Sequence, residues 1–282
     1  MPAQPISKES TRGGSADNAI EVRNLHVRYG TREILHGVNF EVPSGETLVI
    51  MGGSGCGKST LLRTLVGLER PSEGEIWIHG KNFAGMSGAE RDELRKKMGM
   101  SFQSGALFGS MTVGENVALP LREHTPLDES TIDIVVRLKL DQVGLSGFEN
   151  YMPAQLSGGM KKRAAIARAL AMDPEILFFD EPSAGLDPII AAGIDELILK
   201  LKKAFRITIL VVTHELASAF LIADRMILLD KGVVVAKGTP DEVRQNNAPR
   251  VRQFLDRVAE PELAAEIDYL QMLTGEDPPQ RR

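Results

Sequence analysis

Alternating apolar and polar residues near the start of the chain predict two β-strands. The segments Ile20–Tyr29 and Val38–Val42 both alternate in this way, as a strand buried on one face does. We therefore expect two antiparallel strands ahead of the glycine-rich segment that follows them. Further along, Ile176–Phe179 is apolar without interruption and is bounded by charged residues, which is typical of a central strand in a parallel sheet.

Apolar residues at helical spacing dominate residues 104 to about 172. The clearest segments lie near Val113–Leu121, Ser130–Val143 and Ser157–Ala171. We therefore expect a helical subdomain, inserted over about residues 104–172. Pro188 suits the first position of a further helix that runs through Leu201.

The two ends of the chain differ in what they can bury. Residues 1–18 are rich in Ser, Gly, Pro and charge, so we expect a disordered tail there. Residues 248–282 carry two apolar stripes at helical spacing, Val251–Val258 and Leu263–Leu270, which predict a helical extension. The chain's own core is one surface that could cover these stripes. The principal domain is expected over residues 19–247.

Composition narrows the classes of partner and of site. The 282 residues carry a net charge of −5, which argues against a surface for duplex nucleic acid. Cys56 is the only cysteine, so an intramolecular disulfide and a cysteine metal cluster are excluded. The apolar runs are far shorter than the roughly 20 residues that a membrane-spanning helix needs. We expect a protein inside the cell that binds no nucleic acid.

Residues 52–60 form a glycine-rich segment with a phosphate-binding pattern. The segment follows the apolar run Leu48–Met51, precedes a helical run, and fits G-x-x-x-x-G-K-[ST]. The backbone N–H groups of such a loop, together with the dipole of the following helix, bind phosphate. Lys58 is expected to reach the β and γ phosphates, and the Ser59 hydroxyl to ligate Mg²⁺. The nucleotide-binding residues expected here are Gly52, Gly53, Ser54, Gly55, Cys56, Gly57, Lys58, Ser59 and Thr60.

Polar side chains follow two of the apolar runs. Asp180 and Glu181 come directly after Ile176–Phe179, and His214 follows a run that ends at Thr213. Adjacent carboxylates are usually surface residues, and a single His at a strand end is usually structural. Loops at the carboxyl ends of parallel strands build ligand sites, however, so these side chains are expected beside the phosphate. Asp180 is then expected to hold Mg²⁺, and Glu181 to stand nearer the γ-phosphate.

Other features admit two interpretations each. The ring of Tyr29, at the end of the first strand, either stacks on a purine or lies at the surface with a solvated hydroxyl. Gln103 ends an apolar strand and is either a turn residue or part of the site. The segment Ser157–Gly159 opens a helix and is either a second anion site or an ordinary cap. The basic run Lys161–Arg163 is expected to be solvated surface, because cations in a first helical turn gain nothing from the dipole.

In their order along the chain, these motifs resemble those of the ATPase subunits of ABC transporters, over about residues 20–245. The motifs are Tyr29, Gly52–Ser59, Gln103, Leu156–Gly159, Asp180–Glu181, Ser183–Asp187 and His214. The resemblance implies an α/β P-loop NTPase (RecA-like) core with an antiparallel β lobe and an inserted α-helical subdomain. It also implies ATP hydrolysis by a homodimer, in which two copies close head to tail on two ATP molecules.

The same resemblance implies roles for single residues. Tyr29 is the implied adenine-stacking ring, Glu181 the general base and His214 the switch histidine. The implied catalytic residues are Glu181, His214, Gln103 and Lys58. The implied metal ligands are Ser59, Gln103 and Asp180, and the implied nucleotide contacts outside the glycine loop are Tyr29, Ser157, Gly158, Gly159 and Asp187.

One departure narrows the resemblance to a branch. Met160 stands where the usual signature has Gln, and this variant is similar to the Mla lipid-asymmetry and Mce-associated ATPases. The branch implies phospholipid trafficking between the inner and outer membranes. The implied partners are an integral membrane permease, a STAS-domain subunit and an MCE-domain protein, at the cytoplasmic face of the inner membrane. The branch further implies that Gly105–Met111 lies near the groove for the permease's coupling helix, and that the C-terminal extension grips the second ATPase subunit.

Two other functions stay open at this stage. The core motifs do not encode cargo, so the chain also fits an ABC transporter for an amino acid or a hydrophobic compound. A second alternative is a soluble ABC ATPase that acts on DNA or ribosomes without transport. The acidic balance and the absence of a long coiled-coil insertion argue against that alternative.

Overall fold

The computed structural model describes residues 17–258, so residues 1–16 of the predicted tail and residues 259–282 of the predicted extension lie outside this range. The strands are β1 (Asn18–Tyr29), β2 (Arg32–Pro43), β3 (Thr47–Met51), β4 (Glu73–Ile78), β5 (Lys81–Asn82), β6 (Met98–Ser101), β7 (Ile176–Asp180), β8 (Thr208–Thr213), β9 (Arg225–Asp230) and β10 (Val233–Gly238). The helices are α1 (Lys58–Leu65), α2 (Gly88–Arg95), α3 (Val113–His124), α4 (Glu129–Gln142), α5 (Gly158–Leu170), α6 (Pro188–Phe205), α7 (Leu216–Ile222), α8 (Pro240–Gln245) and α9 (Pro249–Leu255), with a 3₁₀ turn at Pro153–Gln155.

A six-stranded sheet in the order β10-β9-β3-β8-β7-β6 forms the centre of the molecule. All neighbouring strands from β9 to β6 run parallel, whereas β10 is antiparallel to β9. The register brings strand ends together, because Met51 pairs with Thr213 and Asp180 pairs with Val212. The segments that follow β3, β6, β7 and β8 therefore leave the sheet at one edge, where parallel α/β sheets place their ligand sites.

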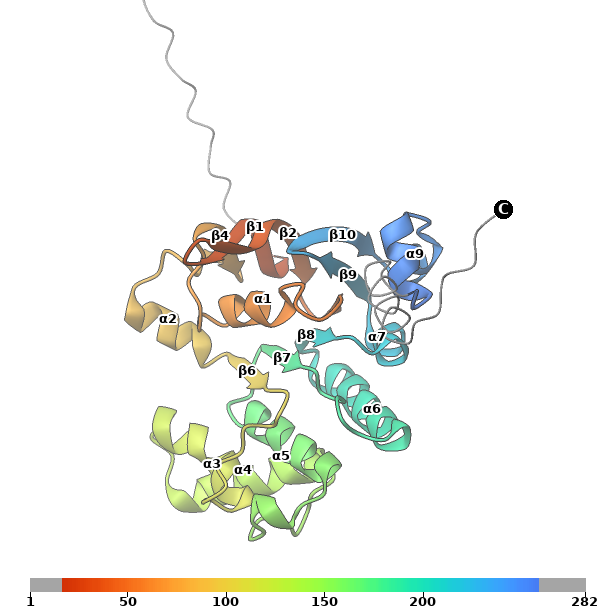
Figure 1. Ribbon diagram of the computed structural model, residues 1–282. Coiled ribbons are helices and arrows are strands. Elements are labelled where there is room, and N and C mark those ends of the chain that lie inside the picture. The colour runs from red at the N-terminus through yellow and green to blue at the C-terminus, as the bar shows by residue number, and fades with distance from the viewer. Residues whose placement is uncertain (1–16, 259–282) are drawn as a thin grey trace, which may run out of the picture.

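Two hydrophobic cores lie on opposite faces of this sheet. Successive strand side chains point to opposite faces, so Leu48 and Ile50 enter one core while Val49 and Met51 enter the other. The first core is completed by α1 and the antiparallel strands, and the second by helices α3 to α7. Figure 1 shows α1 between β1, β2 and β4 above and the parallel strands below. Burial on both faces explains the uninterrupted apolar run of β7.

The second sheet, in the order β2-β1-β4-β5, is antiparallel throughout. The predicted first two strands are confirmed, and both are longer than the sequence pattern indicated. The predicted tail (1–18) is wrong at its last residue, because Asn18 already belongs to β1. Asn18 pairs with Pro43 in the ladder, and its side-chain amide donates to Glu41.

Helices α3, α4 and α5 lie together beyond β6, apart from the antiparallel sheet (Figure 1). They share one core with the second face of the central sheet, and the three predicted helical segments are confirmed. Side-chain caps set their starts: Thr112 before α3, Asp128 before α4 and Ser157 before α5 each accept a backbone N–H bond. Pro188 occupies the first turn of α6, as predicted.

Helix α9 begins the C-terminal extension and packs on the chain's own core. Val251 is buried in that core, and Phe254 packs against it. The Arg250 guanidinium makes two 2.7 Å bonds to the carboxylate of Asp230 at the end of β9. The second predicted stripe, from Leu263 onward, lies outside the described residues. Among residues 17–258, the helices are all too short or too polar to cross a bilayer.

Candidate active site

The glycine-rich loop joins β3 to α1. At two of its glycines, neighbouring atoms leave no room for a Cβ. A Cβ on Gly52 would lie 2.2 Å from the carbonyl oxygen of Leu229, and one on Gly57 would lie 2.8 Å from Leu35. Gly57 also has a φ of 107°, which side chains rarely adopt. Because Gly57 precedes α1 without a side-chain cap, the first N–H groups of this helix are available to an anion.

The ammonium of Lys58 lies over this loop. Its Nζ donates to the carbonyl oxygens of Gly52 and Gly53, each at 2.9 Å. The buried Cys56 thiol is 4.0 Å from the same nitrogen. Burial raises the pKa of that thiol, and the Lys58 charge acts in the opposite direction. The loop thus presents one cation together with the free N–H groups of α1.

Asp180 ends β7 with a buried oxygen that lacks a partner. Its Oδ1 makes no hydrogen bond to any atom of residues 17–258. Burial raises the pKa of the Asp180 carboxyl, and the neighbouring Glu181 raises it further. The charges of Arg63, Lys58 and Lys162 oppose this rise. A buried, unpaired carboxylate oxygen is suited to a metal ion, which would remove the cost of leaving it unsatisfied.

Glu181 is held in an unusual backbone conformation at the same edge. The residue is 8% exposed and has a φ of 50°, in the left-handed region. Its N–H donates to the Val212 carbonyl oxygen at 2.8 Å, so β8 fixes its position. The Oε1 atom lies 2.8 Å from Nδ1 of His214, whose backbone N–H also approaches Oε2 at 3.4 Å. The carboxylate and the imidazole, predicted at two strand ends, therefore meet.

Gln103 stands one strand further along the same edge. It follows β6, which pairs with β7 through Ser101 and Phe179. Gln103 is exposed, and its main-chain carbonyl oxygen accepts a 2.5 Å bond from Nζ of Lys162. The structure therefore brings Gln103, Lys58, Asp180, Glu181 and His214 to one edge of the sheet.

The other predicted residues do not join this cluster within one chain. Ser157 caps α5 by accepting a bond from Met160, and the packing of α5 explains the second glycine, since a Cβ on Gly159 would lie 2.5 Å from Ile190. Asp187 caps α6 through its Oδ1, which accepts from the N–H groups of Ile189 and Ile190. Tyr29, at the end of β1, is an exposed ring.

One interpretation of the sequence was wrong. The basic run Lys161–Arg163 was expected to be solvated, but Lys162 is only 7% exposed and bonds to main-chain oxygens. Arg163 likewise donates to the Val143 carbonyl oxygen at 2.9 Å. The helical spacing of the sequence could have indicated that Lys162 is buried, because Lys162 lies three residues after the buried Gly159 and four before the buried Ile166.

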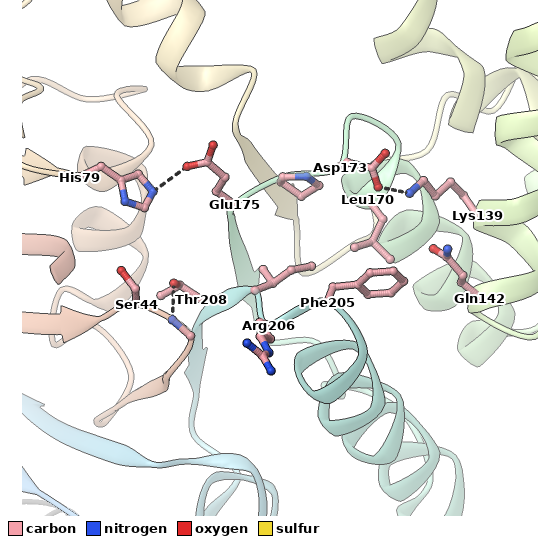
Figure 2. Close-up of a pocket in the computed structure, with 13 residues that line it drawn as sticks. Ser44, His79, Lys139, Gln142, Leu170, Asp173, Glu175, Phe205, Arg206 and Thr208 are labelled. Carbon is pink, nitrogen blue, oxygen red and sulfur yellow. Dashed lines mark hydrogen bonds and ion pairs between the residues drawn. The ribbon is translucent and has the colours of Figure 1, made fainter. Parts of the chain in front are cut away.

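A cavity of about 380 Å³ lies at the opposite edge of the central sheet (Figure 2). Glu175 and Thr208, at the starts of β7 and β8, help to line it. Figure 2 shows His79 facing Glu175 and Lys139 facing Asp173 across its walls. None of the predicted site residues contributes to this lining.

Curated relatives match most of the chain. The intermembrane phospholipid transport system ATP-binding protein MlaF of Haemophilus influenzae is 45% identical over 238 residues, which is 84% of this chain and 90% of that protein. MlaF of Escherichia coli K12 is 44% identical over 246 residues, covering 87% and 91%. The probable ribonucleotide transport ATP-binding protein Mkl of Mycobacterium tuberculosis H37Rv is 43% identical over 249 residues, covering 88% and 69%.

Solved structures give the same result for the fold. A dimeric ATP-binding cassette in a post-hydrolysis state, bound to ADP and Pi, has a TM-score of 0.72 at 33% identity and covers 78% of this chain and 98% of its own. CbiO1 of Clostridium perfringens, part of an ABC transporter complex, has a TM-score of 0.75 at 31% identity, with coverages of 89% and 99%. The family model described as ABC transporter matches residues 35–184. These matches confirm the predicted P-loop NTPase fold and ATPase class, and the chain belongs to the ABC transporter family.

Proposed function

We propose that the chain is the ATP-hydrolysing subunit of an ABC complex that moves phospholipid between the inner and outer membranes and so maintains outer-membrane lipid asymmetry. The observation that carries the hydrolytic part is the contact between Glu181 and His214 at the same sheet edge as the phosphate loop. The phospholipid part is supported by the MlaF relatives, of which the chain covers 90% and 91%.

The Mkl relatives support ribonucleotide as a second candidate cargo. The Mkl proteins, named as probable ribonucleotide transporters, are 43% and 44% identical to this chain, against 44% and 45% for MlaF. Identity alone therefore does not separate the two cargoes. The share of each relative that the match covers favours phospholipid as the cargo. The chain covers at least 90% of the MlaF proteins but only 69% of the Mkl proteins.

ATP and Mg²⁺ fit the residues at this edge. The loop from Gly52 to Thr60, with the N-terminus of α1, would hold the phosphates. Ser59, Gln103 and the unpaired Oδ1 of Asp180 would hold Mg²⁺. Among residues 17–258, no group of three or more His, Cys, Asp or Glu side chains could hold a metal ion by itself. That absence suits Mg²⁺, which is usually bound by one or two carboxylates together with substrate phosphates.

Within this proposal Glu181 is the general base. Its Oε1 is already bonded to His214, which would hold the carboxylate toward the attacking water. Lys58 would neutralise charge on the β and γ phosphates. Asp187 caps α6 and so stabilises the loop before that helix. It would therefore contribute to nucleotide binding by holding the segment Ser183–Asp187 in place.

The functional unit in this proposal is a head-to-tail homodimer. Ser157, Gly158 and Gly159 lie at the N-terminus of α5. Helix α1, which follows the phosphate loop, lies on the other side of β6 and β7 from α5 (Figure 1). In each half-site, one chain would hold the phosphates with its glycine-rich loop, and the other chain would contact them with its Ser157 segment. Two of the solved neighbours are dimeric cassettes. Tyr29 would stack on adenine within the same half-site.

A groove between α2, β6 and α3 would receive the membrane partner. Its volume is about 830 Å³, and Met98, Met100, Phe102 and Phe108 form part of its lining. Charged residues, among them Arg95, stand around this apolar floor. Phe108 belongs to the predicted segment Gly105–Met111 and is 51% exposed. An apolar floor with a charged rim suits a short amphipathic helix of a permease.

The remaining partners follow from the same proposal. A permease in the inner membrane would hold the ATPase at the cytoplasmic face, and a STAS-domain subunit and an MCE-domain protein would complete the complex. The experiment is to purify the complex from membranes through this chain, identify the subunits and extract the bound lipid. A permease with bound phospholipid supports the proposal. A complex whose ATPase is stimulated by ribonucleotide cargo, or a chain that purifies without any membrane protein, contradicts it.

A further inference from the structure

Lys162 is a buried ammonium that the proposed chemistry does not use. It lies in the second turn of α5 and is 7% exposed. Its Nζ donates to the carbonyl oxygen of Gln103 at 2.5 Å and to that of Glu181 at 2.9 Å. Burying a lysine is unfavourable unless its charge is compensated. Two main-chain oxygens at the active edge supply that compensation.

The two acceptors belong to the segments that carry the proposed catalytic side chains. Gln103 follows β6 and Glu181 follows β7, and these strands are neighbours in the sheet. Glu181 has a left-handed backbone, which is unfavourable for a residue with a side chain. Such a conformation persists only where its surroundings determine it. Here the Val212 carbonyl holds the N–H of Glu181, and Lys162 holds its carbonyl oxygen.

Helix α5 is in turn fixed against the sheet. It packs on β6 so closely that a Cβ on Gly99 would lie 2.2 Å from the Ala169 carbonyl oxygen. Arg168, on the same helix, donates to the carbonyl oxygens of Gly105 and Ala106 at 2.9 and 2.7 Å. The segment after Gln103 is therefore tied to α5 at two points. The N-terminus of this same helix is the Ser157 segment.

Burial and the neighbouring carboxylates shift the pKa of Lys162 in opposite directions. Burial lowers the pKa of the ammonium, whereas the carboxylates of Glu181 and Asp180 raise it. The hydrogen bonds of Lys162 go to main-chain oxygens, so its contacts act on the backbone at Gln103 and Glu181 and leave the Glu181 carboxylate to His214.

We propose that Lys162 is a positioning residue for ATP hydrolysis, which links the signature helix α5 to the backbone of Glu181 and Gln103. Through these two bonds Lys162 keeps the carbonyl groups of Gln103 and Glu181 at fixed positions relative to α5. The Glu181 carboxylate is then aligned for hydrolysis only while α5 holds the position that nucleotide and a second protomer impose on its N-terminus. This inference rests on Glu181 as the general base.

The experiment compares Lys162→Met with Lys162→Arg in the full chain. Removing the ammonium should lower kcat by about a hundredfold, the size of loss that a misplaced catalytic group can cause. The KM for ATP and the equilibrium Kd for ATP should stay within about threefold, because the phosphate loop is untouched. Lys162→Arg should recover most of the turnover, since a guanidinium can donate to both carbonyl oxygens. Lys162→Gln serves as a second neutral variant if Lys162→Met does not fold.

Lys139→Met is the matched control. Lys139 is 5% exposed, lies in α4 and bonds to Asp173 at 2.5 Å, at the opposite edge of the sheet. Its loss should leave kcat unchanged, so a fall specific to Lys162 is not a general effect of losing a buried lysine. An unchanged kcat in Lys162→Met, or no recovery in Lys162→Arg, overturns the inference. Glu181→Gln is measured alongside. If Glu181→Gln keeps full turnover, the general-base assignment fails. If Glu181→Gln is inactive while Lys162→Met keeps full turnover, only the positioning role of Lys162 fails.

Discussion

The Nδ1 atom of His214 lies 2.8 Å from Oε1 of Glu181, across the ends of two neighbouring strands. The two residues are 33 positions apart in the sequence. The contact arises because β7 and β8 pair in parallel, so the residues that follow them leave the sheet side by side. A carboxylate held in this way cannot rotate freely, which suits a group that must orient a water molecule.

Replacing Glu181 with Gln should nearly abolish turnover while ATP still binds. The amide keeps the shape of the side chain but cannot accept a proton, and a general base contributes about 10²–10⁴-fold to a rate. Steady-state ATPase assays and an equilibrium ATP titration measure the two quantities. Hydrolysis at the rate of the unmodified chain would remove Glu181 from the role of base.

Replacing His214 with Ala should lower kcat and leave the Kd for ATP nearly unchanged. The carboxylate of Glu181 loses its 2.8 Å partner, whereas the phosphate loop keeps its contacts. We expect a smaller loss than for Glu181→Gln, because the base itself remains. A loss of ATP affinity with normal kcat would show that His214 acts in binding.

Replacing Lys58 with Ala should weaken ATP binding itself. Hydrogen bonds to charged groups contribute about 1.5–3 kcal/mol, so the Kd should rise about ten- to hundredfold. Lys200→Ala is the control, because Lys200 is an exposed lysine on α6. Equal affinities for the Lys58 and Lys200 variants would contradict the phosphate-binding role.

Replacing Phe108 with Arg should prevent the chain from purifying with its membrane partner. The side chain lies in the 830 Å³ groove, and a charge there would be buried against an apolar helix of the partner. Leu68→Arg is a matched control, since Leu68 is an exposed hydrophobic residue that does not line the groove. If both variants keep the partner, this groove is not the docking site.

The N-cap of α4 predicts a pH dependence of stability. Hydrogen bonds from Ser130 and Thr131 lower the pKa of Asp128 from 3.8 to about 2. A lowered pKa in the folded state means that the stabilisation is complete above about pH 4 and is lost as the pH falls toward 2. Asp128→Asn keeps the cap but cannot titrate. Thermal melts should show the unmodified chain losing stability relative to Asp128→Asn across this window, and parallel curves would contradict the assignment.

The local sequence pattern was sufficient to predict the glycine-rich loop and the first two strands. Gly52–Thr60 is a contiguous motif, and the alternation of β1 and β2 depends only on which face of each strand is buried. The meeting of Glu181 and His214 was also predictable, because the carboxyl ends of parallel strands share one edge.

Contacts that depend on tertiary packing were not predictable in the same way. Lys162 was assigned to the surface from its charge and its place in a first turn. Its burial follows from the close packing of α5 on the sheet, as at Gly99, and its helical spacing to the buried Gly159 and Ile166 was the one local sign of it. The Arg250–Asp230 ion pair that anchors α9 likewise joins residues that are distant in the sequence.

The head-to-tail dimer is the central claim, and sedimentation velocity of the Glu181→Gln chain tests it most directly. With Mg²⁺ and ATP this variant should sediment as a dimer, and with ADP or without nucleotide as a monomer. Adding Ser157→Arg to the same chain should abolish the dimer, because the new side chain would block the proposed anion site at the start of α5. A Glu181→Gln chain that stays monomeric with ATP, or a dimer that persists with Ser157→Arg, contradicts the account.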